Sequence, residues 1–284
     1  MRLETLTRRL PQGSALAAAV LLTACDSGVT VDVLADPPPN VSSVSIPIKG
    51  VQFEDDSGDT DSIELDTADP VDLISYQNGT LYRLVTDEKL SKGDYNGVRL
   101  LFGDEEDATV TRSDGGVYPV NFDTNSYADV DFSLSDNDNE EILFAIDLRL
   151  SLAWDDDAEE YTFEPVTRAV REKDASTLSG VIDENLIDDC DEPGDAAVYL
   201  FEKENVDPDD YDDESPDPIA TTPVRADGTG SYVYAFDALS EGKYTVSFTC
   251  EGNEENPSED DDIDFEQSEN VSIDSDESAD QDFD

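Results

Sequence analysis

The chain alternates apolar and polar residues in short runs, and no helical period lasts for more than two turns. Such alternation, interrupted by turns rich in Gly, Asp and Asn, is typical of β-strands with one buried face. The longest predicted strand covers residues 141–154 and places Phe144, Ile146, Leu148 and Leu150 on its apolar face. The pattern predicts an all-β fold.

A hexapeptide occurs twice, and each copy runs directly into an alternating strand. The first copy is Leu90–Tyr95 (LSKGDY) and the second is Leu239–Tyr244 (LSEGKY). A tyrosine that enters a strand from a glycine turn can hold a sandwich corner, with its ring buried and its hydroxyl bonded to nearby backbone. The repeat predicts two tandem β-sandwich domains (Ig-like or transthyretin-like), with Tyr95 and Tyr244 in structural roles.

One short turn carries a strong local signal. Asn78-Gly79 separates the apolar runs 71–76 and 81–85. Asn-Gly between two such runs is typical of a tight β-hairpin, because both residues tolerate a positive φ. We therefore expect these two runs to pair with each other.

The first 24 residues have the pattern of a lipoprotein signal peptide. Several arginines precede an apolar stretch, residues 14–24, that is too short to span a bilayer as a helix. The stretch leads into Leu22–Cys25 (LTAC), which resembles a bacterial lipobox. Processing there would leave an acylated Cys25 as the membrane anchor, followed by a tether over 25–40 that contains one short strand. The alternative is an ordinary secreted protein with a chance cysteine.

Two further cysteines, Cys190 and Cys250, both fall in the second predicted domain. In the oxidising compartment that export implies, we expect them to form a disulfide. Two free thiols are the alternative. A metal site built on two thiols is disfavoured, because the chain has no histidine to complete it.

The charge of the chain is strongly negative: 72 Asp and Glu residues against 16 Lys and Arg give a net charge of −56. Apolar residues still make up 37% of the sequence, which is enough to build cores. The acidic residues therefore indicate a folded protein with a surface adapted to high salt, where self-repulsion is screened. Nucleic acid and anionic lipid are poor partners for such a surface.

Several segments of the first predicted domain occur in the order of one known family. They are Val71–Leu73 with Gln77–Gly79, Leu90–Tyr95 with Val98–Leu100, Ala145–Leu152 and Phe163–Arg168. Over residues 29–172 the chain resembles domain of unknown function 4382, found in lipoproteins of bacteria and archaea. The family has no established activity, so the resemblance implies a fold and an envelope location and supplies no catalytic residue.

The second predicted domain has the strand Asp227–Tyr232 (DGTGSY) before the Leu239–Tyr244 turn. This order resembles the carboxypeptidase regulatory-like or transthyretin-like sandwich, which usually serves as a spacer or adhesion unit. The resemblance implies a second sandwich over 176–284, after a first over 41–172. Beyond about residue 254 the acidic chain either supplies the last strands or is a disordered tail.

The absence of histidine narrows the candidate chemistry. Ser-His-Asp and Cys-His catalysis and histidine metal sites are excluded. Residues 136–140 and 260–264 present acceptors as a calcium loop does, but neither has the Gly and Glu positions of an EF-hand. We predict no catalytic residue, no metal ligand and no cofactor, with a looser calcium site in a sandwich turn as the alternative.

The sequence-based hypothesis is a lipid-anchored, extracytoplasmic binding or scaffolding lipoprotein of a salt-adapted prokaryote, without catalytic activity. Cys25 would attach it to a membrane, facing the periplasm or the cell exterior, and it would bind a protein or a polysaccharide. The alternatives are a carboxylate-based hydrolase of extracellular polysaccharide and a passive envelope spacer. A concave pocket with a buried pair of acids would favour the hydrolase, and a flat face would favour binding.

Overall fold

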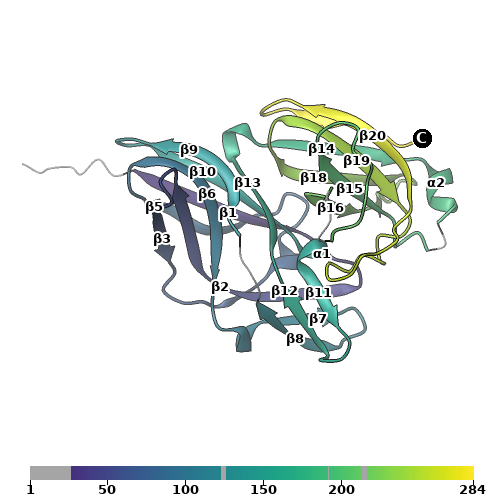
Figure 1. Ribbon diagram of the computed structural model, residues 1–284, viewed down its shortest axis with the longest axis horizontal. Coiled ribbons are helices and arrows are strands. Elements are labelled where there is room, and N and C mark those ends of the chain that lie inside the picture. The colour runs from purple at the N-terminus through teal and green to yellow at the C-terminus, as the bar shows by residue number, and fades with distance from the viewer. Residues whose placement is uncertain (1–26, 123–125, 191, 213–215) are drawn as a thin grey trace, which may run out of the picture.

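The structure is a computed structural model that describes residues 27–122, 126–190, 192–212 and 216–284. Figure 1 shows two lobes, one formed by the first part of the chain and the other by the green and yellow remainder. In the described ranges no sheet contains strands from both lobes, and we refer to the lobes as the first and second domains. The all-β fold predicted from the alternation is confirmed. No described helix is long and apolar enough to cross a membrane.

The first domain is a sandwich of two sheets. Its elements are β1 (Gly28–Asp36), β2 (Val41–Asp55), β3 (Thr60–Glu64), β4 (Pro70–Asp72), η1 (Leu73–Ser75), β5 (Tyr82–Lys89), β6 (Gly93–Phe102), η2 (Glu105–Asp107), β7 (Thr109–Arg112), β8 (Val117–Phe122), β9 (Ala128–Leu134), β10 (Asn139–Asp147), α1 (Leu148–Ser151), β11 (Leu152–Asp155), β12 (Glu160–Phe163), β13 (Val166–Arg171) and η3 (Glu172–Asp174). One sheet has the order β13-β10-β1-β5, and the other runs β11-β12-β8-β7-β2-β6-β9 with β3 and β4 paired to β2. Apolar side chains from both sheets form one core.

The second domain is a smaller sandwich of two four-stranded sheets. Its elements are β14 (Ser176–Ile182), α2 (Glu184–Asp188), β15 (Ala197–Glu202), β16 (Ala220–Pro223), β17 (Arg225–Ala226), β18 (Tyr232–Leu239), β19 (Gly242–Thr249), β20 (Phe265–Ile273) and β21 (Ser278–Asp280). The sheets have the orders β17-β18-β14-β21 and β16-β15-β19-β20. The acidic end of the chain is therefore ordered and supplies β20 and β21, which decides between the two alternatives for residues after 254.

The tether predicted over 25–40 is wrong for residues 28–36. These residues form β1, and every residue of β1 is buried. β1 lies between β10, to which it pairs in parallel, and β5, to which it pairs antiparallel. Valines 29, 31 and 33 are 0% exposed, so the alternation in this segment indicates a core strand. The first domain therefore begins at or before residue 28 rather than at residue 41.

The strand predicted over 141–154 is interrupted. β10 ends at Asp147, α1 makes one helical turn, and β11 begins at Leu152. The Asp147 carboxylate accepts hydrogen bonds from the backbone N–H groups of Arg149 and Leu150, each 3.0 Å long, and so caps the turn. The apolar pattern did not reveal the break, because Leu148 and Leu150 stay buried in the turn as they would in a strand.

The predicted hairpin around Asn78-Gly79 is wrong, although its turn is present. Asn78 and Gly79 have φ of 53° and 75°, and the Thr80 N–H donates to the Gln77 carbonyl over 3.1 Å. The runs on either side pair elsewhere, β4 with β2 and β5 with β1. Partners offered by the two sheets of the sandwich outweigh the local signal of the turn.

Tyr95 and Tyr244 hold equivalent corners in the two domains. The Tyr95 hydroxyl lies 2.8 Å from the Ser91 carbonyl and 2.8 Å from Asp61 Oδ2, and it shares its one proton between these acceptors. The Tyr244 hydroxyl donates to the Ser240 carbonyl over 2.8 Å. Both rings are buried, and burial raises the pKa of both phenols. Each tyrosine thus ties the turn to the strand that follows it.

The two corners yield a stability prediction. Tyr244→Phe removes one buried hydrogen bond and should lower the free energy of unfolding by about 1 kcal/mol. Tyr95→Phe should cost up to about 2 kcal/mol, because two acceptors lose their donor. Denaturant unfolding in high salt measures both, with Tyr232→Phe on the neighbouring strand β18 as control. A Tyr244→Phe protein as stable as the control would contradict the structural role.

Candidate functional site

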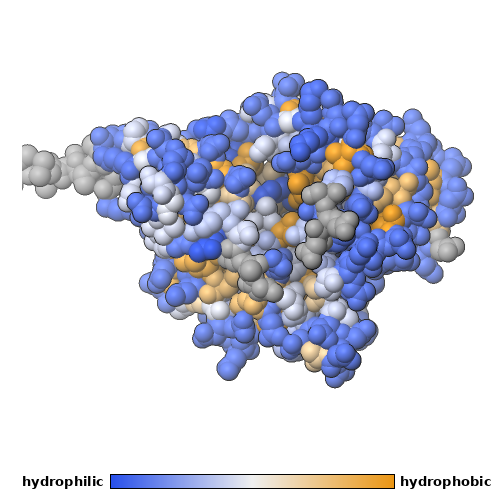
Figure 2. Space-filling model, in the orientation of Figure 1, coloured by the Kyte–Doolittle hydropathy of each residue, from blue (hydrophilic) through white to orange (hydrophobic). Residues whose placement is uncertain are grey.

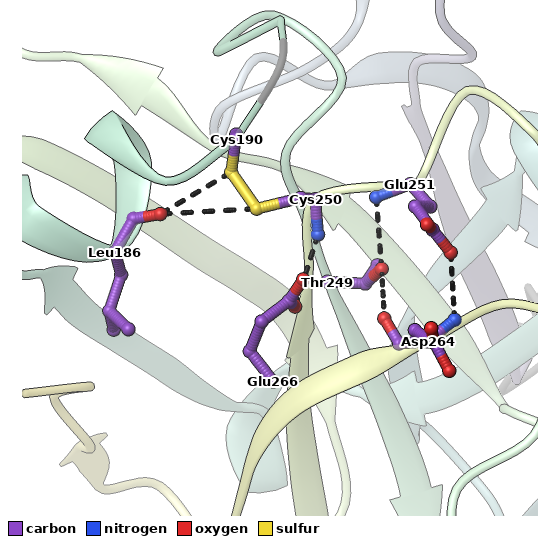
Figure 3. Close-up of a disulfide and its surroundings, with 7 residues drawn as sticks. All are labelled: Leu186, Cys190, Thr249, Cys250, Glu251, Asp264 and Glu266. Atoms are coloured by element: carbon purple, nitrogen blue, oxygen red, sulfur yellow. Dashed lines mark hydrogen bonds between the residues drawn. A yellow bond between two sulfur atoms is a disulfide. The ribbon is translucent and has the colours of Figure 1, made fainter.

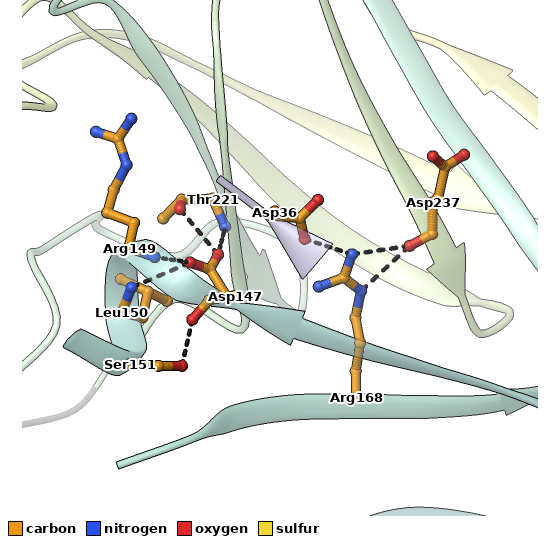
Figure 4. A network of polar contacts seen from close by, with 8 residues as sticks. All are labelled: Asp36, Asp147, Arg149, Leu150, Ser151, Arg168, Thr221 and Asp237. Carbon is orange, nitrogen blue, oxygen red and sulfur yellow. Dashed lines mark hydrogen bonds and ion pairs between the residues drawn. The ribbon is translucent and has the colours of Figure 1, made fainter. Parts of the chain in front are cut away.

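The two domains meet at a buried carboxylate, that of Asp147 (Figure 4). Asp147 is 0% exposed, and besides capping α1 it accepts hydrogen bonds from Thr221 of β16. The Thr221 hydroxyl donates over 2.8 Å, and the Thr221 backbone N–H donates to the same oxygen. Burial raises the pKa of Asp147, and these hydrogen bonds oppose the rise. One carboxylate therefore joins a turn of the first domain to a strand of the second.

Arginines of the first domain make two further contacts across the interface. Arg168 on β13 donates to Asp36 over 2.8 Å and to the backbone carbonyl of Asp237 in β18 over 2.9 Å. Burial raises the pKa of Asp36 to about 6, and the Arg168 guanidinium opposes the rise. Arg149, which is buried, donates to the Gly252 carbonyl. Arg168 thus contacts both Asp36 in its own domain and the backbone of Asp237 in the second domain, and Arg149 contacts the backbone of Gly252 in the second domain.

Two smaller contacts complete the interface. Ala238 of the second domain packs in an apolar cluster with Leu34, Ala145 and Val170 of the first. Arg225 on β17 reaches back to the turn at residues 77–78, where it donates to Gln77 Oε1 over 2.7 Å and to Asn78 Oδ1. The interface is therefore a mixture of apolar packing and directed hydrogen bonds, which define one docking geometry for the domains.

A cleft of about 580 Å³ lies beside this interface. The first domain contributes α1, β11 and β12, including Trp154, and the second contributes residues 211–212 and 257–260. Five of the described lining side chains are carboxylates and none is cationic. Figure 2 shows a mainly hydrophilic face that is interrupted by apolar residues near the middle, where the two lobes meet. The volume falls in the range of small-ligand sites.

Trp154 is held in the cleft wall by its neighbours on β7, β8 and β12. The rings of Tyr118 and Tyr161 each lie 4.9 Å from the indole, measured between centroids. The Arg112 guanidinium lies 3.8 Å from the centroid of the Trp154 ring. The indole N–H donates to Asp156 over 2.6 Å. These contacts fix the orientation of the indole, and the Arg112 guanidinium covers one of its faces, so a ligand would stack on the other face.

Five acidic side chains converge in the second domain's side of the cleft, and we refer to Asp210, Asp212, Glu255, Asp260 and Asp261 as the acidic cluster. One carboxylate oxygen from each of Asp210, Glu255 and Asp261 lies within 4.8 Å of the others, and the same holds for Asp210, Asp212 and Asp260. Asp212 and Asp260 line the cleft, whereas Asp210 is 0% exposed. The cluster offers oxygen ligands of the kind that hard cations prefer.

Burial perturbs the acids at the centre of the cluster. It raises the pKa of Asp210 to about 6, with the neighbouring Asp209 adding to the rise. It raises the pKa of Glu255 to about 8, with Asp210 adding to the rise and Arg149 opposing it. The pKa of Asp261 is raised by the same cause. Negative charge at this place is therefore less stable than at an ordinary carboxylate.

The predicted disulfide partners, Cys190 and Cys250, are joined in the structure, with their Cα atoms 5.2 Å apart. Figure 3 shows that this disulfide lies beside the base of the loop 251–264. The Thr249 hydroxyl donates to the Asp264 carbonyl over 2.8 Å, and the Asp264 N–H donates to the Glu251 carboxylate over 2.8 Å. These bonds close the base of the loop that carries three of the clustered acids.

The other residues singled out from the sequence lie elsewhere. Cys25 and the signal peptide over 1–24 fall outside the described residues. Tyr95 and Tyr244 do not line the cleft. The acidic turn 136–140 joins β9 to β10, where Asp138 accepts a hydrogen bond from the Ser135 N–H over 2.8 Å. Only the segment 260–264 of the two calcium candidates contributes to the acidic cluster.

The cluster itself was missed because its members come from two separate acidic loops. A signal was present in the strand between Ala197 and Glu202, which reads AVYLFE. Five consecutive buried residues require cover on both faces of the strand. The only long segments near enough in sequence to provide the second cover are acidic, so burial of acids at this place could have been anticipated.

Residues 27–165 of the chain match the family model described as domain of unknown function (DUF4382). Residues 27–165 are a DUF4382 domain. The resemblance of the second domain to carboxypeptidase regulatory-like modules remains a prediction. None of the curated proteins compared with the chain matches its sequence.

Two solved structures of bacterial surface proteins share a weak similarity with the whole chain. A candidate adhesin of Bacteroides ovatus is 10% identical, with a TM-score of 0.22, over 87% of this chain and 82% of its own. The fimbrial anchor protein of Porphyromonas gingivalis is 12% identical, with a TM-score of 0.20, over 78% of each chain. Scores this low establish neither a shared fold nor a shared role.

The contact between Asp147 and Thr221 yields a prediction about domain docking. Thr221→Val keeps the backbone N–H contact and removes the hydroxyl, so we expect a loss of about 1–2 kcal/mol in the free energy of unfolding. Thr222→Val, at the adjacent buried threonine, is the matched control. Asp147→Ala removes the cap of α1 as well as the acceptor and should cost about 3 kcal/mol or more. If Thr221→Val behaves as Thr222→Val does in denaturant unfolding, the hydroxyl contact to Asp147 does not stabilise the docking of the domains.

Proposed function

We propose that the protein is a lipid-anchored, extracytoplasmic binding or scaffolding lipoprotein without catalytic activity. In this proposal an acylated Cys25 holds the chain on the membrane, and the cleft between the domains binds an uncharged, hydroxyl-rich glycan. The observation that carries the proposal is the cleft itself, which is lined by Trp154 and by carboxylates contributed by both domains.

The lining of the cleft favours this class of ligand on chemical grounds. Carboxylates are strong acceptors for sugar hydroxyl groups, and hydrogen bonds to an ionised acceptor are about twice as strong as neutral ones. An indole offers an apolar ring face to the C–H face of a sugar. The described lining side chains include five carboxylates and no cation, so this lining would repel an anionic glycan, although the Arg112 guanidinium lies 3.8 Å from the centroid of the Trp154 ring. At high salt these short-range contacts persist while long-range charge attraction is screened.

The geometry favours binding over hydrolysis. Asp210 and Glu255, whose pKa values are about 6 and 8, are not among the residues that line the cleft.

Glycan binding is tested with purified protein in molar KCl against a neutral polysaccharide, such as dextran or mannan, and a uronate polymer as the acidic comparison. We expect the neutral polymer to bind and the uronate polymer not to bind. Trp154→Ala should weaken binding by about tenfold, because it removes the stacking surface. Tyr82→Ala, an aromatic residue outside the cleft, should leave binding unchanged.

Three results would count against the proposal. Release of reducing ends from the polysaccharide would contradict the absence of catalysis. Equal binding of the uronate polymer would contradict the class of ligand. Failure to bind any polymer of a broad neutral panel would leave the passive envelope spacer as the better hypothesis.

The anchor is tested separately from the cleft. Cys25→Ala should abolish incorporation of labelled fatty acid and move the protein from the membrane to the soluble fraction, because the acyl chains supply the membrane affinity. Globomycin, which blocks lipoprotein signal peptidase, should cause the precursor to accumulate. A Cys25→Ala protein that stays bound to membranes after a salt wash would sink the lipid anchor and leave the glycan proposal standing.

A further inference from the structure

In the part of the chain that the structure describes, the acidic cluster contains buried carboxylate oxygens without a hydrogen-bond partner. Asp210 is 0% exposed, and its Oδ1 has no hydrogen-bond partner, while its Oδ2 accepts from the Asp261 N–H over 2.6 Å. Glu255 Oε1 is likewise buried without a partner, while its Oε2 accepts from the Tyr199 hydroxyl over 3.0 Å. Enclosed, unpaired carboxylate oxygens are costly, because burial removes water and nothing replaces it.

The loops that bring these acids together are held in place by other contacts. The Asn256 N–H donates to Asp261 Oδ2 over 2.7 Å, and the base of the loop 251–264 is closed beside the disulfide. Below the loops, Tyr199 and Phe201 pack against Val206, Ile263 and Phe265. Apolar packing and hydrogen bonds therefore hold the acids together against their mutual repulsion.

We propose that the acidic cluster binds one Ca²⁺ ion. Asp210, which belongs to both groups of converging oxygens, is the central ligand, with Glu255 and Asp261 on one side and Asp212 and Asp260 on the other. The ion would accept the two unpartnered oxygens as ligands and neutralise the repulsion among the acids. It would tie residues 210–212 to the loop 251–264 and so stabilise the second domain's wall of the cleft.

The chemistry of the donors selects the ion. All candidate side-chain ligands are carboxylates, which suits a hard cation, and the chain has no histidine for zinc, copper or nickel. Opposite ligands of a Ca²⁺ ion lie up to about 5 Å apart, twice its bond length of about 2.3–2.6 Å. The three oxygens of each group, which lie within 4.8 Å of one another, therefore fit one coordination shell, and Asp210 is common to both groups. The shell of Mg²⁺ is tighter and about 4 Å across.

Arg149 is the cation that competes with this assignment. The positive charge of its guanidinium opposes the rise in the pKa of Glu255. Its Nη1, however, donates to the Gly252 carbonyl rather than to a carboxylate of the cluster. Among the described residues, Arg149 Nε is itself buried without a hydrogen-bond partner, as are Asp210 Oδ1 and Glu255 Oε1, so the arginine does not satisfy these oxygens. A bound ion can satisfy them, because it contacts several carboxylates at once.

The test is calorimetric titration of the detergent-solubilised, EDTA-treated protein with CaCl₂ in molar KCl, together with thermal unfolding. We expect one ion per chain with a Kd between about 10⁻⁵ and 10⁻³ M, weaker binding of Mg²⁺, and a Tm that rises with calcium concentration. Asp210→Asn and Glu255→Gln should each weaken calcium binding by more than about tenfold. Asp262→Asn, an exposed acid in the same loop, is the matched control and should bind as the unaltered protein does.

The calcium-free variants separate this proposal from a purely structural role. Without calcium, Asp210→Asn should melt at or above the temperature of the unaltered protein, because it removes a buried, repelled charge and keeps an acceptor oxygen. Lower melting without calcium would indicate that the acids support the fold by themselves. Absence of one-to-one binding, or an equal loss in Asp262→Asn, would overturn the site. No glycan is present, so the result is independent of what the cleft binds.

Discussion

The arrangement of the two domains depends on one buried carboxylate, that of Asp147. Asp147 is the last residue of β10, and its carboxylate caps the single turn of α1. The same carboxylate accepts a hydrogen bond from the Thr221 hydroxyl of the other domain. At this turn the chain passes from β10, in the small sheet, to β11, in the large sheet, and Trp154 of β11 lies at the cleft. The position of the cleft is thus a consequence of a hydrogen-bonding requirement at the interface. An alanine at 147 would leave three backbone N–H groups without their acceptor.

The scarce cations of the chain are used in two different ways. Arg149 and Arg168 are enclosed at the interface and direct several N–H groups at backbone carbonyls and carboxylates. The lysines that form ion pairs, namely Lys49, Lys92, Lys173 and Lys243, have side chains at least half exposed. A planar guanidinium loses less freedom per hydrogen bond than a flexible ammonium, and exposed ion pairs contribute little. The arginines therefore carry the docking, and the acidic surface remains largely unneutralised.

The sequence predicted what alternation and turn chemistry encode and missed what depends on partners distant in sequence. It identified the all-β fold, and it placed Tyr95 and Tyr244 in strands that follow glycine turns. It assigned the short strand within residues 25–40 to a tether, whereas residues 28–36 form a central strand of a sheet. The sequence of a central strand and that of an isolated strand look alike, because the two differ only in their neighbours. It also paired the runs flanking Asn78-Gly79, since a local turn signal carries no information on the competing partners β1 and β2. The domain interface and the cleft required the assembled structure.

The acidic cluster is best understood through the sheet beneath it. The outer face of the sheet β16-β15-β19-β20 carries Tyr199 and Phe201, both 0% exposed, and apolar area of this size is unstable in water. The segments available to cover it are acidic, in a chain with a net charge of −56. Covering the apolar face therefore forces carboxylates such as Asp210 and Glu255 out of water. Dissolved salt screens buried charges poorly. A cation bound directly among these carboxylates would neutralise their repulsion, which screening at high salt does not do.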